Sequence, residues 1–219
     1  MRLVLATRNE HKLRELAQLM RPHELVPLPD EVTLPPETGT TFADNALGKA
    51  RAAAAATGRT SIADDSGIEA SALGGAPGVW SARFAGDDAT DEENLAKLLE
   101  EVPPEGDTRV RYVCAIACVE PGGAEHVVHG RCAGRLTHEP RGSGGFGYDP
   151  AFVPDDYDDG RTMAELSPDE KDEISHRGRA ARELRRILLE AEDEARPRGP
   201  LADLMRGGRE RRQAGRRGR

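Results

Sequence analysis

The run Ser61–Gly67, with the sequence S-I-A-D-D-S-G, places two adjacent carboxylates directly after two small apolar residues. Those apolar residues predict the end of a short buried strand. In an extended chain neighbouring side chains point to opposite faces, so Asp64 and Asp65 can face one ligand only if the strand ends there. Gly67 allows a turn, because glycine adopts positive φ without steric cost. We therefore expect the strand to end in a polar turn at Asp64–Gly67.

This turn has two interpretations. A carboxylate at a strand end, beside the hydroxyl of Ser66 and a flexible glycine, fits a position for Mg²⁺ and phosphate. The alternative is a polar turn in which Asp64 or Asp65 only caps a loop. For these four residues alone the second outcome is the more common one, so other parts of the sequence must decide.

The charge of the chain is unevenly distributed. Its 219 residues suit one large domain or two closely packed lobes. The formal net charge is −8, yet residues 196–219 hold nine Arg and only two acidic residues. An acidic body argues against a protein that wraps nucleic acid. We divide the chain into a domain over residues 1–195 and an Arg-rich tail over 196–219, which we expect to be disordered.

Cysteine usage points to a cellular compartment. Cys114, Cys118 and Cys132 show neither C-x-x-C spacing nor a metal-knuckle pattern, and the first two lie in an apolar run that predicts buried thiols. An odd count without a signal peptide predicts a reducing, cytoplasmic setting. No apolar run approaches membrane-spanning length, so we expect no contact with a membrane.

Hydrophobic periodicity predicts strands and helices in alternation. The expected strands are Arg2–Ala6, a run within 25–36, the residues before Asp64, and a hairpin of Val110–Val119 with Glu125–Cys132. The expected helices are Lys12–Met20, Phe42–Thr57 with Gly58 as its stop, a helix opened by the capping box Thr90–Glu93 and ending near Glu101, and most of Met163–Ala191 with Ser175 as an N-cap.

The first loop, T-R-N-E-H-K, leads from a strand into a helix. Thr7, Asn9 and Lys12 lie where free backbone N–H groups and the helix dipole attract anions. The alternative is that Thr7 or Asn9 merely caps the helix, and these residues alone leave both interpretations open. The loop lacks P-loop spacing.

The helix expected over Phe42–Thr57 carries two polar residues four positions apart. Asn45 and Lys49 therefore share one face, and Glu37 lies just before the helix. This face can offer an amide, an ammonium and a carboxylate to the two aspartates. The more common alternative is a solvated face on an alanine-rich helix.

The run R-G-S-G-G-F-G-Y-D-P matches the text pattern G-x-G-x-x-G but does not predict a dinucleotide site. That fingerprint must open a helix, and Pro150 pushes the preceding residue out of the helical region. The glycines instead suit close backbone approach to a flat ligand, with Phe146 or Tyr148 packing on it and Asp149 accepting from a base or ribose.

Lysine is rare in this chain, with four residues in a Lys and Arg total of 31. Three of the four, Lys12, Lys49 and Lys171, fall in the motifs described here, which favours positions that need a compact ammonium, although chance also produces such a bias. Lys171 precedes His176 and Arg177. A lone His there is more often structural, whereas a Lys with a His–Arg pair at a helix start better fits an anion or base-edge site.

Five motifs together resemble the RdgB-like family of XTP/dITP pyrophosphatases, also called inosine triphosphate pyrophosphatases, over about Arg2 to Leu189. They are T-R-N-E-H-K, E-T-G-T-T-F-A-D-N-A-L-G-K-A, A-D-D-S-G-I, G-G-F-G-Y-D-P and E-K-D-E-I-S-H-R-G. The resemblance implies an α/β fold with an elongated mixed β-sheet, flanking helices and two lobes around a central active-site cleft. It also implies a homodimer that hydrolyses dITP, ITP and XTP to the monophosphate and pyrophosphate with Mg²⁺.

The resemblance also implies roles for individual residues. Asp65 would be the catalytic base and a metal ligand, and Glu37 is the candidate for the second metal carboxylate. The substrate-binding residues would be Thr7, Arg8, Asn9, Glu10, His11, Lys12, Lys49, Ser66, Phe146, Gly147, Tyr148, Asp149, Lys171, His176 and Arg177. Lys12 and Lys49 would neutralise the departing pyrophosphate.

Three alternatives remain open at this point. The chain could be a pyrophosphatase for other modified nucleotides, or a nucleotide-binding module without catalysis. It could also bind nucleic acid through the Arg-rich tail, against which the acidic body argues. The hydrolase hypothesis requires that Asp65, Lys12 and Lys171 line one cavity.

Overall fold

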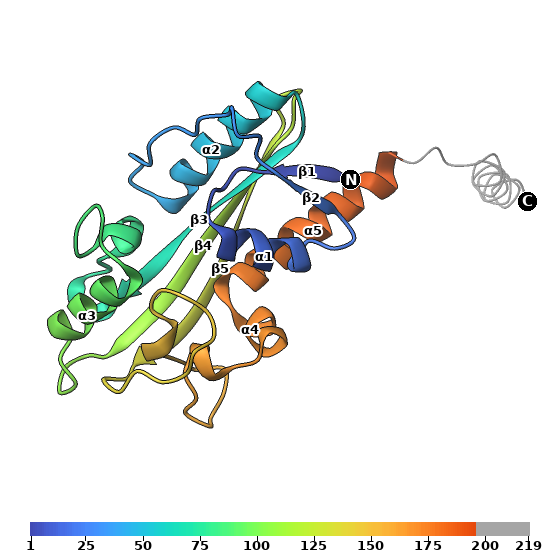
Figure 1. Ribbon diagram of the computed structural model, residues 1–219. Coiled ribbons are helices and arrows are strands. Elements are labelled where there is room, and N and C mark those ends of the chain that lie inside the picture. The colour runs from blue at the N-terminus through green and yellow to red at the C-terminus, as the bar shows by residue number, and fades with distance from the viewer. Residues whose placement is uncertain (196–219) are drawn as a thin grey trace, which may run out of the picture. The chain divides into compact units, whose positions relative to one another are not determined.

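A computed structural model describes residues 1–195 of the chain (Figure 1). The tail predicted over residues 196–219 lies outside the described residues. The chain divides into two compact units, residues 1–185 and 186–219. The sheet and the candidate site belong to the first unit. In the second, the described residues continue the last helix, where Arg186 and Glu190 form an ion pair at 2.8 Å.

Within residues 1–195, six strands form one mixed sheet in the order β2-β1-β3-β4-β5-β6. They are β1 (Arg2–Leu5), β2 (Glu24–Pro27), β3 (Ser61–Ala70), β4 (Arg109–Val119), β5 (Glu125–Leu136) and β6 (Phe152–Pro154). β1 pairs in parallel with β2 and β3, and the other neighbours pair antiparallel. The predicted α/β class with a mixed sheet is confirmed.

The helices begin and end largely where local signals place them. They are α1 (Glu10–Leu19), α2 (Phe42–Thr57), α3 (Asp91–Glu101), α4 (Pro168–Ile174) and α5 (His176–Ala195). Gly58 ends α2 with φ of +62°, and Thr90 with Glu93 forms the predicted capping box of α3. No helix among residues 1–195 combines the length and apolar character that crossing a bilayer requires.

The stretch predicted as mostly helical, Met163–Ala191, is interrupted. A 3-10 turn at Met163–Glu165 precedes α4, and α4 ends before Ser175. The Ser175 hydroxyl accepts a hydrogen bond from the Gly178 N–H at 3.0 Å, so this residue caps the start of α5 as predicted. Because of this break between α4 and α5, Lys171 of α4 lies near the first residues of α5.

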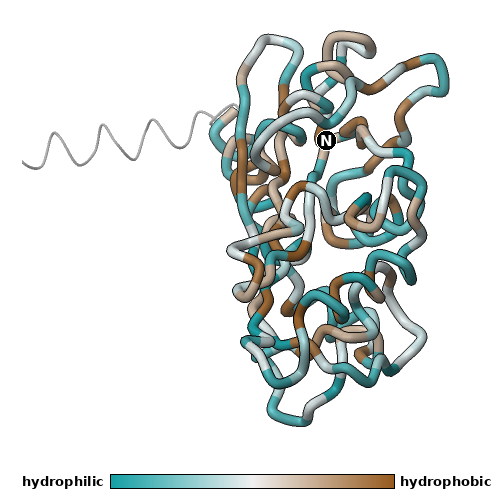
Figure 2. The backbone as a smooth tube through the Cα atoms, turned by 90° about the vertical axis from the view of Figure 1, so that its left-hand side faces the viewer, coloured by the Kyte–Doolittle hydropathy of each residue, from teal (hydrophilic) through white to brown (hydrophobic). Residues whose placement is uncertain are grey.

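Helices cover both faces of the sheet (Figure 1). On one face the alanines of α2, such as Ala46 and Ala50, pack on Ala63 and Ala115, and small residues on both sides allow close approach. On the other face the first turn of α5 lies so close to β5 that a Cβ atom on Gly130 would collide with the His176 carbonyl oxygen. The outer loops are mostly hydrophilic (Figure 2). All three cysteines are buried free thiols.

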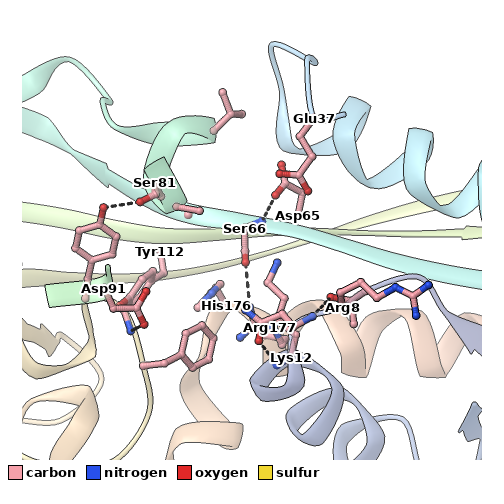
Figure 3. A pocket seen from close by; sticks show the side chains of 18 of the residues that line it. Arg8, Lys12, Glu37, Asp65, Ser66, Ser81, Asp91, Tyr112, His176 and Arg177 are labelled. Atoms are coloured by element: carbon pink, nitrogen blue, oxygen red, sulfur yellow. Dashed lines mark hydrogen bonds between the residues drawn. The ribbon is translucent and has the colours of Figure 1, made fainter. Parts of the chain in front are cut away.

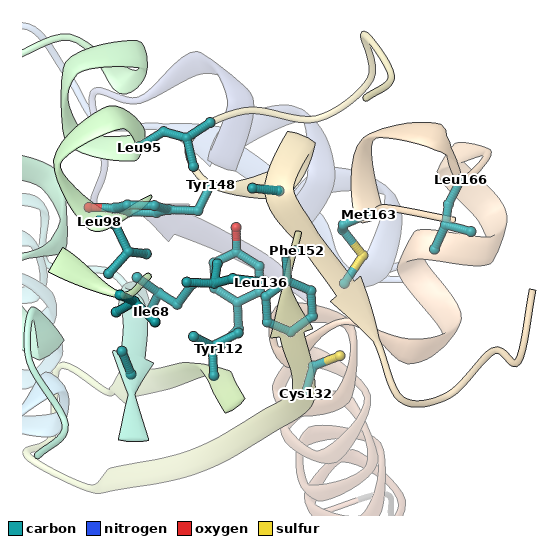
Figure 4. Packing of buried hydrophobic residues seen from close by; sticks show 14 of the residues in the cluster. Ile68, Leu95, Leu98, Tyr112, Cys132, Leu136, Tyr148, Phe152, Met163 and Leu166 are labelled. Carbon is teal, nitrogen blue, oxygen red and sulfur yellow. The ribbon is translucent and has the colours of Figure 1, made fainter. Parts of the chain in front are cut away.

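A second apolar cluster joins α3 to the far ends of β3–β5 (Figure 4). Leu98 of α3 packs there with Ile68, Tyr112 and Phe152, and Tyr148 of the glycine-rich loop belongs to the same cluster. Fully burying each such side chain contributes about 1.5–3 kcal/mol. The cluster therefore anchors the glycine-rich loop to the sheet.

The strand that carries the adjacent carboxylates continues past them. β3 pairs with β4 without interruption from Ser61 to Ala70, so the predicted turn at Asp64–Gly67 is wrong. The ladder to β4 overrides the local turn chemistry. Gly67 instead permits close packing, because a Cβ atom there would collide with Ser81 Oγ. β1 ends at Leu5, so among the described residues the edge of β3 at Asp64 has no further strand on that side.

Candidate active site

A cavity of about 320 Å³ opens at this free edge of β3 (Figure 3). Its walls come from the end of β1 and the start of α1, the loop before α2, α2 itself, β3, the 3-10 segment Gly78–Arg83, the glycine-rich loop, α4 and α5. Asp65, Lys12 and Lys171 all line it, which meets the requirement stated for the hydrolase hypothesis.

The cavity collects nearly every residue that the sequence suggested. Among the predicted site residues only Glu10 and His11 do not line it. Glu10 is exposed in the first turn of α1. The His11 ring lies against the Phe146 ring, with centroids 5.1 Å apart and planes tilted by 33°. The lining residues from the prediction are Thr7, Arg8, Asn9, Lys12, Glu37, Lys49, Asp65, Ser66, Phe146, Gly147, Tyr148, Asp149, Lys171, His176 and Arg177.

Asp65 is held on the side of the sheet that α2 covers. Asn45 Nδ2 donates to Asp65 Oδ2 at 2.9 Å, and the Ser66 N–H donates to Oδ1 at 3.0 Å. Burial raises the pKa of this carboxyl group, and the neighbouring Glu37 adds to the effect, although Lys49 opposes it. A raised pKa makes this carboxylate a stronger proton acceptor.

Lys49 and Glu37 complete this side of the cavity. The Lys49 ammonium donates to Glu37 Oε1 and to the Asp64 carbonyl oxygen, the latter at 2.7 Å. Burial acts to lower the pKa of Lys49, but the surrounding carboxylates outweigh burial and raise it. Asn45 and Lys49 are both buried. The alternative of a solvated face is therefore wrong, and α2 does present an amide and an ammonium to the aspartates.

Asp64 faces the opposite side of β3. Its Oδ2 lies 3.0 Å from Lys12 Nζ and 3.3 Å from Arg177 Nη2. Burial acts to raise the pKa of Asp64, but Lys12 and Arg177 outweigh burial and hold it well below its usual range. Ser66 lies on the same side, where its hydroxyl accepts from Arg177 Nη2 at 2.9 Å.

Glu15 of α1, a carboxylate that the sequence did not suggest, binds two cations of the cavity. Its Oε1 accepts from Lys171 at 2.8 Å and its Oε2 from Arg177 at 2.6 Å. Lys171 also donates to Asp149 Oδ2 at 2.8 Å. Alternating charges thus link Lys12, Asp64, Arg177, Glu15, Lys171 and Asp149 into a chain, of which Lys12, Arg177, Lys171 and Asp149 line the cavity. Helical spacing from Lys12 to Glu15 was the available signal, because positions three apart share a face.

The glycine-rich loop is fixed by its own aspartate. Asp149 accepts from the Phe146 N–H at 3.0 Å and from the Tyr112 hydroxyl at 2.9 Å. Tyr148 is buried and donates to the Ser81 carbonyl at 2.7 Å, so its ring belongs to the core. Phe146 is the aromatic residue of this loop that remains half-buried at the cavity, with Lys171 Nζ 5.0 Å from its ring centroid.

The glycine-rich loop makes one further hydrogen bond that the sequence did not suggest. The Gly147 N–H donates to Asp91 Oδ2 at 2.8 Å, which links the loop to the start of α3. Asp91 also lines the cavity.

His176 is a buried base in a positively charged surrounding. Its ring stacks on Tyr112, with centroids 4.6 Å apart and planes 15° from parallel. Burial lowers the pKa of His176 well below its usual value, and Arg177 and Lys171 add to this, so the imidazole is neutral at pH 7. Its Nδ1 is buried and has no hydrogen-bond partner within the described residues.

The polar residues of the first loop have structural partners of their own. Asn9 Oδ1 accepts from the N–H groups of His11 and Lys12, so this residue caps α1 while it also lines the cavity. The Arg8 guanidinium points away from the cavity (Figure 3) and donates to backbone carbonyls, including those of Leu28 at 2.9 Å and Val32 at 3.0 Å. Its charge thus anchors the loop that leads towards Glu37.

Arg83 anchors the same loop from the other side. Its Nη2 donates to the Glu37 carbonyl oxygen at 3.0 Å, and its guanidinium lies 4.3 Å from the centroid of the Trp80 ring. Asn45 Oδ1 accepts from the Gly39 N–H at 2.8 Å. The backbone around Glu37 is therefore held at two points.

The carboxylates on the α2 side fit a hard divalent cation. Figure 3 shows the carboxyl groups of Glu37 and Asp65 next to each other on one side of β3, with Lys12, His176 and Arg177 on the other side. Residues 1–195 contain no group of three or more His, Cys, Asp or Glu side chains placed to bind one ion. Mg²⁺ keeps several of its waters and needs only one or two carboxylates plus substrate phosphates, so the donor set suits it.

Comparison with known proteins gives consistent matches over most of the chain. A sequence model described as the Ham1 family matches residues 3–187. A dITP/XTP pyrophosphatase from Desulforamulus reducens is 47% identical over 194 residues, covering 86% of this chain and 96% of the relative. One from Frankia alni is 52% identical over 202 residues, covering 87% and 98%. The solved structure of a HAM1 protein from Coxiella burnetii superposes with a TM-score of 0.79 at 43% identity, covering 87% of this chain and 99% of that one.

Proposed function

Because the chain belongs to the Ham1 family, we propose that it hydrolyses dITP, ITP and XTP to the nucleoside monophosphate and pyrophosphate, and so removes deaminated purines from the nucleotide pool. One observation carries the proposal. A single cavity brings Asp65 and Glu37 on one side of β3 together with Lys12, Lys171 and Arg177 on the other. Carboxylates opposite several cations suit a metal-bound triphosphate.

Asp65 and Glu37 are the residues that would hold Mg²⁺. When bound, Mg²⁺ neutralises phosphate charge and polarises the phosphoryl group under attack. The ammonium of Lys49 donates to Glu37 and to the Asp64 carbonyl oxygen, and so ties the loop of Glu37 to β3.

The chemistry that the residues would perform is attack of water on the α-phosphorus with pyrophosphate as the leaving group. Asp65 accepts the proton of the attacking water, for which its raised pKa is suited. Such general-base assistance contributes about 10²–10⁴ in rate. Lys12 and Lys49 neutralise charge on the departing pyrophosphate.

Selectivity would reside at position 6 of the purine. Inosine and xanthosine carry a carbonyl oxygen there, and adenosine carries an amino group. Donors buried in the cavity would be left unpaired against adenine, and such mismatches reach about 10⁴ in selectivity. The candidate donors are His176, Arg177 and backbone N–H groups, and the neutral His176 imidazole has one N–H to offer.

The setting of the enzyme completes the proposal. Three free thiols suit the reducing cytoplasm, which is also where a nucleotide pool would be cleansed. The resemblance carried by the five motifs supports a homodimer. Sedimentation equilibrium tests the dimer, and a monomer at micromolar concentration contradicts it.

A panel of nucleoside triphosphates tests the function. Pyrophosphate release with Mg²⁺ is measured for dITP, ITP, XTP, ATP, GTP and modified pyrimidine triphosphates, on the wild type and on Asp65→Asn. We expect turnover of the deaminated purines, and a loss of about 10²–10⁴ in kcat for Asp65→Asn with ITP still bound. Preference for another nucleotide would indicate the wrong substrate class, and tight ITP binding without any product would indicate a non-catalytic module.

A further inference from the structure

Glu15 occupies the centre of the charge chain along the cavity. It lies on α1, and each of its two carboxylate oxygens binds a cation from a different helix, Lys171 of α4 and Arg177 of α5. The side chain of Glu15 is 20% exposed, whereas those of Lys171 and Arg177 are 10% and 2% exposed. One carboxylate therefore fixes the separation of two nearly buried cations.

Each of these two cations also binds a second carboxylate, and the two second carboxylates differ. Lys171 binds Asp149, and Arg177 binds Asp64. Asp149 belongs to the glycine-rich loop and Asp64 to β3, so neither partner relates one cation to the other. Within the described part of the chain, Glu15 is the carboxylate that both share. Removal of Glu15 would still leave each cation paired with a carboxylate. An effect of that removal would therefore reflect the positions of the two cations and not an uncompensated charge.

The two cations lie where a flat ligand would meet the cavity wall. Lys171 Nζ is 5.0 Å and the Arg177 guanidinium is 5.5 Å from the centroid of the Phe146 ring. Burial acts to raise the pKa of Glu15, but Arg177 and Lys171 outweigh burial and lower it, so this carboxylate stays ionised at neutral pH. A permanent anion behind two cations holds their donor groups in one arrangement.

We propose that Glu15 is a positioning residue for purine recognition, which aligns Lys171 and Arg177 at the nucleoside end of the cavity and thereby sets the preference for a 6-oxo purine. This inference rests on the proposed function. Glu15 touches neither Asp65 nor Glu37 and approaches from the opposite side of β3, so it acts on substrate binding more than on the chemical step. Without Glu15 the position of each cation depends only on its other carboxylate partner. The donor groups are then no longer aligned for a 6-oxo purine, and other bases can bind.

The test compares Glu15→Ala and Glu15→Gln with a matched control, Asp169→Asn. Asp169 is exposed on α4 and accepts from Gln18 of α1 at 3.4 Å. The control therefore also removes one negative charge at a contact between α1 and α4, but leaves the cavity intact. Values of kcat and KM are measured with ITP and ATP, and thermal unfolding shows that each variant is folded.

For Glu15→Ala we expect KM for ITP to rise about tenfold or more, kcat to stay within about threefold, and the ITP-over-ATP preference to fall about tenfold. Glu15→Gln keeps the size of the side chain and one acceptor oxygen. Its KM for ITP and its ITP-over-ATP preference should lie between those of Glu15→Ala and the wild type. Asp169→Asn should match the wild type. The inference is overturned if ITP and ATP are affected equally, or if Asp169→Asn reproduces the effect.

A second measurement separates this inference from the proposed function. Binding of ITP and ATP is measured by calorimetry in the Asp65→Asn background, with and without Glu15→Ala. If the wild type hydrolyses no deaminated purine, the proposed function fails, and the binding data still decide the role of Glu15. A loss of the ITP preference supports the positioning role, and an unchanged ratio of dissociation constants refutes it.

Discussion

Asp64 and Asp65 are consecutive residues of β3 whose carboxylates lie on opposite faces of the sheet, one bound by Lys12 and Arg177 and the other by Asn45. Their pKa values shift in opposite directions as a result, lowered for Asp64 and raised for Asp65. Asp64 is a permanent anion that orders cations, whereas Asp65 is placed to take up a proton. Asp65 lines the cavity itself, whereas Asp64 acts on it through Lys12 and Arg177, which do line it.

Removing the Asp64 charge should destabilise the protein. Asp64→Asn takes one carboxylate from Lys12 and from the buried Arg177, and breaking a buried pair costs about 3–5 kcal/mol. Since Glu15 still binds Arg177, we expect about 3 kcal/mol, measured as the free energy of unfolding in urea. The control is Asp107→Asn, whose partner Arg109 is exposed and whose loss should leave the free energy of unfolding nearly unchanged. Equal losses in the two variants would contradict the ordering role of Asp64.

Asn45 should matter for the rate rather than for affinity. Its amide joins the Asp65 carboxylate to the Gly39 N–H, so it holds Asp65, the base in the proposed reaction, relative to the loop of Glu37. We expect Asn45→Ala to lower kcat with ITP about tenfold or more, with KM changed by less than about threefold.

Asn94→Ala is the matched control for this prediction. Asn94 is also a buried amide, and it bridges the Ala85 N–H and the Ala82 carbonyl. We expect a comparable loss of stability, about 1–3 kcal/mol, but an unchanged kcat. If both variants lose activity in proportion to stability, Asn45 has no specific part in placing Asp65.

Asp172 should make stability depend on pH. Burial and then Glu15 raise the pKa of its carboxyl group to about 6, above the usual value of 3.8. The folded state therefore binds the proton more readily, and the ionised carboxylate costs stability above pH 6 but not below pH 4. Asp172→Asn should raise Tm at pH 7.5, by the equivalent of about 1 kcal/mol after solvent screening, and leave Tm unchanged at pH 4. An equal gain at both pH values would rule out this titration.

Gly130 should tolerate no side chain. A Cβ atom there would collide with the His176 carbonyl and the Ala180 N–H, so Gly130→Ala must push α5 away from β5. We expect a loss of about 1–3 kcal/mol or more in the free energy of unfolding. Gly122→Ala in the β4–β5 turn, where a Cβ atom meets open space, serves as control and should change stability by less than about 0.5 kcal/mol. A neutral Gly130→Ala would show that α5 can shift freely.

Local signals in the sequence predicted the helices well. Gly58 and the Thr90–Glu93 capping box act through neighbouring atoms, so their effect is readable without the rest of the fold. The five motifs also predicted the family, and the comparisons confirm it. Most of the cavity wall followed from the same motifs, because each motif carries several of its residues.

What the sequence did not reveal depends on partners that are distant along the chain. The run at Asp64 and Asp65 reads as a turn by itself, but the ladder to β4 keeps it extended. Glu15 gains its role from Lys171 and Arg177, more than 150 residues away. The hydrogen bond from the Arg8 guanidinium to the Leu28 carbonyl oxygen likewise joins positions 20 residues apart. Such pairings require the assembled sheet and helices.

The alternating charges from Lys12 to Asp149 leave that wall of the cavity with three cations already matched by three anions. A ligand with one phosphate gains little there, since it must compete with a resident carboxylate for every cation that it meets. A nucleoside triphosphate reaches Lys12 with its phosphates and Arg177 and Lys171 with its base, so it competes with the carboxylates at several cations at once. Retention would then depend on an intact nucleotide, and cleavage itself would weaken the binding of both products.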